Sequence, residues 1–165
     1  MFLQKLVNGI LFIYFLFMTI ATPLFHGQSC LPTNFFPKFL VDIKSHYVEE
    51  HSDYLVGEQP DFFVGLIWVN LLVQWPLCIA NLYAIITNKS WFKKTCLIYG
   101  VFTASGLVAI LSELIRSPKA PLDLVYLYAR LMGFALFAIL NGLVPLYSDS
   151  SVNVTRPPVA RKKRA

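Results

Sequence analysis

Three histidines and six carboxylates lie in one stretch of the chain, where they could together bind a metal or transfer a proton. The histidines are His26, His46 and His51, and six of the nine acids fall between Asp42 and Asp61. Their spacing fits no metal-ligand motif. We therefore interpret these histidines as solvated or hydrogen-bonded loop residues, and we expect no metal.

The usual signatures of enzymes are missing from the sequence. It contains no G-x-S-x-G, no H-E-x-x-H, no Walker loop and no Gly-rich dinucleotide fingerprint. The cysteines, Cys30, Cys78 and Cys96, are odd in number and lack C-x-x-C spacing, so neither a disulfide framework nor a zinc site is indicated. We expect a protein that is not an enzyme, has no catalytic residues and uses no cofactor.

Polar side chains inside apolar segments are the other candidates for chemistry. Asn70 and Gln74 are four residues apart and share one face of a helix. They could line a ligand cavity, or they could bind a neighbouring helix through hydrogen bonds worth about 0.6 kcal/mol each. The sequence leaves both interpretations open. Arg130, also inside an apolar segment, needs a partner, and we expect Glu113 or Asp53 to supply it as an ion pair.

The composition indicates which class of protein must position these side chains. Hydrophobic residues make up 56% of the 165 residues, charged residues 14%, and the mean hydropathy is +0.59. A soluble domain carries about 25% charged residues, and a chain with 15% aromatic residues does not stay disordered. The sequence therefore predicts an integral membrane protein, whose net charge of +5 bears on topology and not on nucleic acid.

Four apolar runs are long enough to cross the roughly 30 Å hydrocarbon core of a bilayer. They cover residues 6–25, 62–86, 95–114 and 122–146. The first is longer than the apolar part of a secretory signal, so we interpret it as a span, with cleavage after Ala21 or near Gly27 as the alternative. The predicted fold is an all-α integral membrane protein, a four-transmembrane-helix bundle.

The distribution of Lys and Arg predicts how the bundle is oriented. Nine of them fall on one side of the spans and four on the other, and the side richer in Lys and Arg faces the cytosol. Both termini are therefore expected to be cytosolic, as a short segment 1–5 and a disordered basic tail 148–165 on either side of a four-helix domain 6–147. The loop 26–61 then faces the lumen.

Part of this lumenal loop is predicted to fold. Its apolar side chains recur at spacings of three and four, which places them on one helical face. They are Phe36, Phe39, Leu40, Ile43 and Tyr47. We interpret residues 36–50 as a lumenal interfacial helix that lies against the bilayer or covers the end of the bundle. The alternative is a loop helix with no part in a pocket.

The tail ends with two lysines, Lys162 and Lys163, at the fourth and third positions from the C-terminus. This spacing resembles the di-lysine retrieval signal of endoplasmic-reticulum membrane proteins. A basic flank that only sets topology is the alternative. We expect the endoplasmic-reticulum membrane to be the location.

Short motifs spread along the chain carry a family resemblance. They are Tyr14-Phe15-Leu16, Leu31-Pro32, Pro37, Tyr47, Asp53, Glu58, Gln74-Trp75-Pro76, Ile98-Tyr99 and Ile110-Leu111-Ser112. On these motifs, the segment from Tyr14 to about Ser112 resembles the sigma-2 receptor branch of the EXPERA-domain family, which also contains the emopamil-binding sterol isomerases. The fourth span matches that branch in hydropathy alone.

The resemblance implies a cavity that is open to lipid, closed on the lumenal side, and able to bind sterols and hydrophobic amines. It also implies a part in cholesterol handling. Expected partners are a sterol or another lipophilic small molecule and membrane lipids, and the resemblance allows a homodimer. An assembly subunit bound to another membrane protein is the competing function. The residues expected at the cavity are Trp68, Phe102 and Leu131, with polar contacts from His26, Tyr47, Asp53, Asn70, Gln74 and Tyr99.

Departures from the family pattern bear on the ligand. The receptor branch presents acids to a ligand ammonium; Asp53 matches one of them, whereas His26 and Asn70 occupy the positions of two others. The resemblance therefore implies weaker binding of tertiary amines, with Asp53 carrying the residual preference. The isomerases move sterol protons with acidic and histidine side chains inside their spans. Isomerase activity is the remaining alternative, and it would depend on Glu113.

Overall fold

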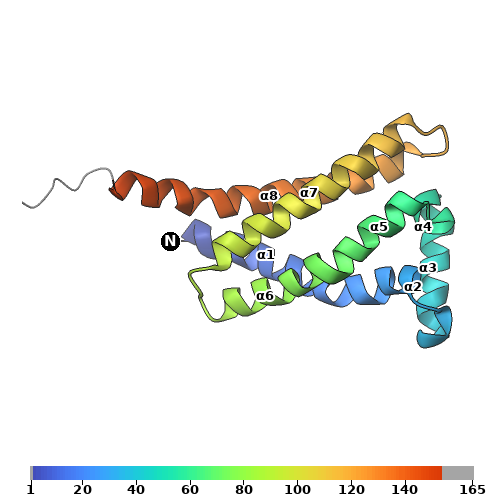
Figure 1. Ribbon diagram of the computed structural model, residues 1–165, viewed down its shortest axis with the longest axis horizontal. Coiled ribbons are helices and arrows are strands. Elements are labelled where there is room, and N and C mark those ends of the chain that lie inside the picture. Colours follow the sequence, from blue (N-terminus) through green and yellow to red (C-terminus); the bar gives the residue numbers. More distant parts are fainter. Residues whose placement is uncertain (1, 154–165) are drawn as a thin grey trace, which may run out of the picture.

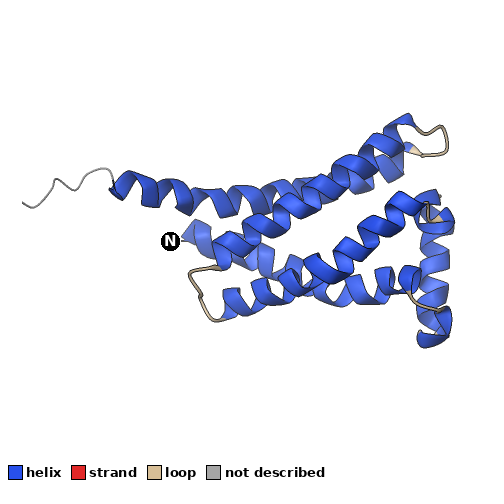
Figure 2. Ribbon diagram, viewed as in Figure 1, coloured by secondary structure: helices blue, strands red, loops and turns tan. Residues whose placement is uncertain are grey.

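The computed structural model describes residues 2–153, and over that range the chain is helical and contains no strand (Figure 2). Four helical segments are long and apolar enough to cross a membrane. They are Gln4–Cys30, Asp61–Ile86, Phe92–Arg116 and Leu122–Val144. These segments overlap the predicted spans along most of their length and confirm the all-α, four-span fold.

The first two spans are each interrupted by a π-helical turn, and the last two are continuous. The first comprises α1 (Phe2–Ala21), η1 (Thr22–His26) and α2 (Gly27–Cys30). The second comprises α5 (Asp61–Val69), η3 (Asn70–Gln74) and α6 (Trp75–Ile86). The third and fourth are α7 (Phe92–Arg116) and α8 (Leu122–Asn153).

A proline accompanies each π turn, Pro23 within η1 and Pro76 just after η3. Because proline has no N–H, it leaves the carbonyl four residues earlier without its helical partner. At the first turn this carbonyl belongs to Thr19, and it accepts a hydrogen bond of 2.9 Å from the Nε1–H of Trp75. A side chain of one span thus completes the backbone of the other, as an irregular turn at membrane depth requires.

The connection between the first two spans is also largely helical. It contains η2 (Thr33–Phe35), α3 (Lys38–His51) and α4 (Tyr54–Glu58). The helix predicted over 36–50 is confirmed as α3, which begins after Pro37 and ends at Ser52, a residue in the left-handed region with φ 50°. In Figure 1, α3 lies across one end of the bundle at a steep angle to the spans.

The spans pack as two pairs, α7 with α8 and α1 with α6 (Figure 1). Two glycines allow the first pair to approach closely. A Cβ on Gly100 would lie 2.9 Å from the Ala135 carbonyl oxygen, and one on Gly142 would lie 2.8 Å from the Lys93 carbonyl oxygen. Lipid is as apolar as a helix surface, so close backbone packing of this kind holds membrane helices together.

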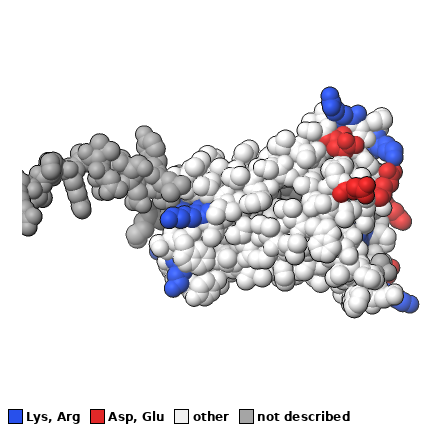
Figure 3. All heavy atoms as spheres, viewed as in Figure 1, with Lys and Arg blue, Asp and Glu red and all other residues white. Residues whose placement is uncertain are grey.

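The outer surface of the spans is apolar, and charged residues gather toward the two ends (Figure 3). Ile13 and Leu72, for example, are each 68% exposed. Water would disfavour such a continuous apolar band, whereas the hydrocarbon core of a bilayer accommodates it. The chain is a multi-pass membrane protein.

The boundaries of the first span correct one expectation. The first helical span extends to Cys30, so His26 lies inside this span and not in a loop. The π turn at Pro23 accounts for the difference, because it absorbs the proline without ending the helix. His46, in contrast, is exposed on α3.

The expected ion pair of Arg130 is wrong. Arg130 is exposed and forms no salt bridge with Glu113 or Asp53. Its long side chain can extend toward the end of the bundle, which makes an internal partner unnecessary. Glu113 instead accepts a hydrogen bond of 3.2 Å from Tyr54.

The expected tail, residues 148–165, begins within helix α8. Helix α8 continues to Asn153, so residues 148–153 are helical where disorder was expected. The rest of the tail, with Lys162 and Lys163, lies outside the described residues.

Candidate functional site

A cavity of about 410 Å³ lies between the spans. All four spans contribute to its wall, for example through Met18, Ile67, Leu107 and Leu131, and α3 contributes Tyr47. Its volume falls within the roughly 300–1,000 Å³ of small-molecule sites, which are mostly apolar with a few placed polar groups. The cavity is therefore suited to a lipophilic ligand with limited polarity.

Asp53 organises the end of the cavity beneath α3. Its side chain is fully buried, and Oδ1 accepts a hydrogen bond from the Val56 N–H at 3.2 Å, which caps α4. Oδ2 accepts two more, from the hydroxyl of Tyr47 at 3.1 Å and from that of Tyr128 at 2.9 Å. One carboxylate therefore connects α3, α4 and α8.

Both tyrosines line the cavity, whereas Asp53 lies behind them. Burial, together with the neighbouring Asp53 charge, raises the pKa of Tyr47 above its usual value, so its hydroxyl remains a donor. Tyr128 is a site residue that the sequence interpretation missed. Helical spacing groups Tyr128 with Leu124 and Leu131 on one face of the fourth span, but in an apolar span the spacing does not show which face turns inward.

The two π turns supply four further polar side chains of the cavity, beside Tyr14 and Thr103. Thr22 and His26 come from η1, and Asn70 and Gln74 come from η3. The two turns contact each other. Turns of this kind are often found at functional sites, because they place side chains that a regular helix would not. Asn70 and Gln74 both lie in the cavity wall, and Gln74 also bonds a neighbouring helix through Thr103, so both interpretations of this pair remain open.

Several of these polar groups have no partner among the described residues. Gln74 Oε1 accepts a hydrogen bond of 2.8 Å from Thr103, but its amide nitrogen forms none. The Asn70 side chain forms none either, and the Nδ1 atom of His26 is buried without a partner. A buried polar atom is normally satisfied, and the Nδ1 atom of His26 is not; together with the two amides, it could bind the polar group of a ligand.

Besides Asp53, three other residues expected at the cavity lie outside its wall. Tyr99 is fully buried behind Tyr14, with the two hydroxyl oxygens 3.0 Å apart. Trp68 and Phe102 are each 44% exposed on the outer surface, which corrects the expectation that they line the cavity. The cause is rotation about each helix: the inner face of α5 is defined by Ile67, next to Trp68, which points about 100° away.

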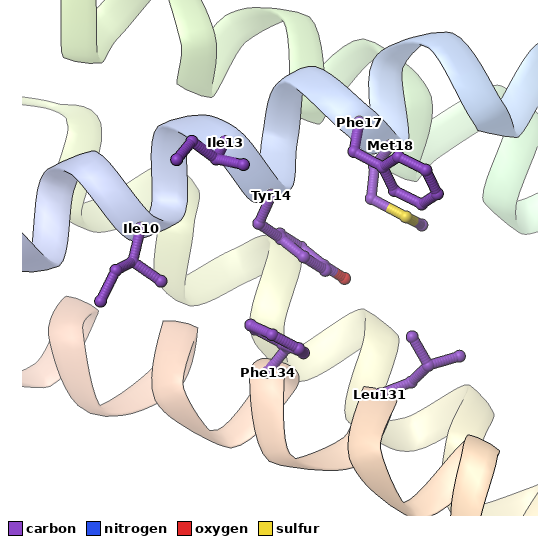
Figure 4. A pocket seen from close by; sticks show the side chains of 7 residues that line it. All are labelled: Ile10, Ile13, Tyr14, Phe17, Met18, Leu131 and Phe134. Carbon is purple, nitrogen blue, oxygen red and sulfur yellow. The ribbon is translucent and has the colours of Figure 1, made fainter.

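An apolar groove between α1 and α8 adjoins the cavity (Figure 4). At its centre the ring of Tyr14 stacks on that of Phe134, with centroids 5.1 Å apart and an interplanar angle of 13°. Tyr14, Phe17, Met18 and Leu131 line both the groove and the cavity. Ile13 and Phe17 of the groove are 68% and 65% exposed, so the groove connects the cavity wall with the lipid-facing surface.

The chemistry available in the cavity is hydrogen bonding. No Asp, Glu, Lys or Arg lines it among the described residues. Glu113 is exposed near the α3 end of the bundle and is not part of the wall. Within the same described range, no group of three His, Cys, Asp or Glu side chains could hold a metal.

The fold and this cavity define a four-span membrane protein with an internal, mainly apolar cavity. The sequence model of the EXPERA family (EXPanded EBP superfamily) matches residues 39–148, and the chain belongs to this family.

Curated relatives share the same name, Sigma intracellular receptor 2. The human protein is 28% identical over 110 residues, which cover 66% of this chain and 62% of the relative. The Macaca fascicularis protein is 29% identical over 110 residues, with the same coverage, and the Xenopus tropicalis protein is 24% identical over 112 residues, 67% of this chain and 66% of the relative. The matched segment thus spans slightly less than two thirds of each relative.

Proposed function

We propose that this chain is a sterol- or lipid-binding, sigma-2-receptor-like protein of the endoplasmic-reticulum membrane that takes part in sterol handling or transport. The observation that carries this proposal is the cavity between the four spans, apolar over most of its wall and polar at the two π turns. The names of the curated relatives, which are receptors, agree with a binding function.

The ligand would enter from the bilayer. The groove between α1 and α8 supports this route, because four of its residues also line the cavity. At the end of the bundle, α3 lies across the spans (Figure 1), and Asp53 is hydrogen-bonded to Tyr47 and Tyr128. A lipophilic molecule would therefore avoid transfer through water, which is the costly step for such a ligand.

The proposed orientation places α3 in the lumen and both termini in the cytosol, on the basis of the Lys and Arg distribution. It predicts that the native sequons at Asn88 and Asn153 carry no glycan, whereas the substitution Glu50→Asn, which creates a sequon at the exposed end of α3, introduces one. A glycosidase-sensitive mobility shift on a gel measures both. A glycan on Asn88 would reverse the proposed orientation.

Sterol isomerase activity is the second candidate, because the family includes emopamil-binding proteins. Glu113, the acid to which this activity was assigned, lies outside the cavity wall and binds Tyr54. A general acid must be within hydrogen-bond reach of the atom that it protonates. The placement of Glu113 therefore favours binding over catalysis. Conversion of an 8-ene sterol by the purified protein would reverse this preference.

The test of the binding function is saturation binding of tritiated cholesterol to the full chain in lipid nanodiscs. We expect saturable binding that Gln74→Leu and Asp53→Asn weaken, the first by removing a cavity amide and the second by disturbing Tyr47 and Tyr128. Asn8→Leu is the matched control, because Asn8 lies on α1 away from the cavity wall.

Absence of saturable binding would refute the receptor function. An assembly subunit would then be the better explanation of the four-span scaffold, and a stoichiometric membrane-protein partner that co-purifies without added sterol would support it. A homodimer is tested separately, by the mass of the protein in nanodiscs or detergent.

A further inference from the structure

We propose that the two π turns, η1 and η3, form a binding site for an uncharged hydroxyl or carbonyl group of the ligand, and that this site disfavours an ammonium. The inference rests on the proposed binding function and specifies the chemistry of the ligand. It depends on which polar atoms of the cavity are free and on their charge.

The free groups of the site are neutral donors and acceptors. The Asn70 amide forms no hydrogen bond with any described residue, and only one end of the Gln74 amide is engaged, by the hydroxyl of Thr103. The ring of His26 also forms no hydrogen bond within the described range. An alcohol both donates and accepts, and a carbonyl accepts, so either can pair with these groups.

A cationic ligand finds no counter-charge in the same place. The cavity wall contains no carboxylate among its described residues. His26 offers none in either protonation state, since a neutral ring is only a dipole and a charged ring repels an ammonium. Burial of an unpaired charge among apolar side chains is strongly unfavourable.

Asp53, the nearest candidate, is already fully engaged. Its two oxygens accept three hydrogen bonds, from the Val56 N–H and from the hydroxyls of Tyr47 and Tyr128. Both tyrosines line the cavity and stand between it and the carboxylate. An ammonium could reach Asp53 only by displacing one of them, which would also break a hydrogen bond that ties α3 or α8 to Asp53.

The placement of the turns fits an amphiphile with a single polar group. η1 and η3 contact each other, so their polar side chains gather at one place in the wall. Much of the remaining wall is apolar and includes Leu107, Leu127 and Leu131. A rigid lipid with one hydroxyl could therefore present its polar group to the turns and its hydrocarbon body to these leucines.

The test uses tritiated cholesterol bound to the full chain in nanodiscs and three competitors that share its skeleton. They are the 3β-alcohol, the 3β-amine and the hydrocarbon that lacks the 3-substituent. At pH 7.4 we expect the alcohol to compete about 5-fold better than the hydrocarbon, the effect of one or two hydrogen bonds. The amine should bind at least about 10-fold more weakly than the alcohol, because it enters the cavity as an unpaired charge.

Variants separate recognition of the polar group from effects on the fold. Asn70→Leu should reduce competition by the alcohol to within about 2-fold of the hydrocarbon and leave the hydrocarbon itself unchanged. His26→Leu should act in the same direction, and Asn8→Leu, outside the cavity, should change neither.

An amine that competes as well as the alcohol would overturn this inference while leaving the binding function intact. The inference would also be overturned if Asn70→Leu and His26→Leu weakened binding of the alcohol and of the hydrocarbon equally. That result would indicate a structural role for both residues. Absence of saturable cholesterol binding would instead refute the proposed function, and this inference with it.

Discussion

Replacement of Tyr128 by phenylalanine tests whether the buried Asp53 cluster holds the end of the bundle together. The substitution removes one hydroxyl and leaves the ring in place. The lost hydrogen bond, 2.9 Å long, goes to Asp53 Oδ2, and Asp53 is fully buried. After the change, Asp53 keeps its bonds from Val56 and Tyr47, and no described side chain replaces the missing donor.

The magnitude follows from the character of this bond. A hydrogen bond to a charged group contributes about 1.5–3 kcal/mol, compared with about 1 kcal/mol for a neutral pair. For a chain of this size, 1 kcal/mol corresponds to about 2–4 °C in Tm. Tyr128→Phe should therefore lower Tm by about 3–12 °C.

The assay can use cysteines that the fold already conceals. Cys78 and Cys96 are buried, so a thiol-reactive fluorophore labels them only when the bundle opens on heating. Tyr126→Phe is the matched control, because Tyr126 lies on the same helix with 60% of its side chain exposed. Its Tm should stay within about 1 °C of the wild type. Equal Tm values for the two variants would refute the role assigned to the Asp53 cluster.

Three further predictions concern the rest of the bundle. Gly142→Ala should lower the free energy of unfolding by about 1–3 kcal/mol, because the new Cβ would meet the backbone of α7. Gly9→Ala is the control in the same thermal assay; Gly9 has open space around it, so this change should be neutral or slightly stabilising. Trp75→Phe should cost about 1–3 kcal/mol, because the Thr19 carbonyl loses its partner; an unchanged Tm would show that this carbonyl is satisfied in another way. Burial lowers the pKa of Lys44 in the folded protein, so the unfolded chain binds the lysine proton more tightly. The wild type should therefore gain stability relative to Lys44→Met as the pH rises toward the ordinary lysine pKa. Parallel dependence of Tm on pH in the two proteins would contradict this prediction.

Hydropathy and periodicity in the sequence determined the number of spans, their approximate ends and the helix α3. These features are local: a run of about twenty apolar residues must cross a bilayer as a helix, because lipid offers its backbone no other partner. The same local logic placed Asn70 and Gln74 on one face, and the structure confirms that this face lines the cavity.

Tertiary structure decided which face of each helix turns inward. In a membrane helix the lipid side and the core side are equally apolar, so periodicity does not distinguish them. For this reason the expectation for Trp68 and Phe102, both of which are exposed, was wrong. Tyr128 escaped notice for a related reason: its partner Asp53 is 75 residues away in the sequence, and only the packing of α8 against α3 and α4 brings them together.

The π turns also depend on tertiary structure. The sequence contains Pro23 and Pro76, which interrupt the helical hydrogen bonds. Whether a helix ends at such a point or continues depends on a neighbour that satisfies the freed carbonyl, and here the indole of Trp75 does so for Thr19. The hydropathy of successive segments therefore determined the class of this protein and the number of its spans, because burial in lipid is a property of each segment. The cavity and its polar groups arose only from the contacts between segments.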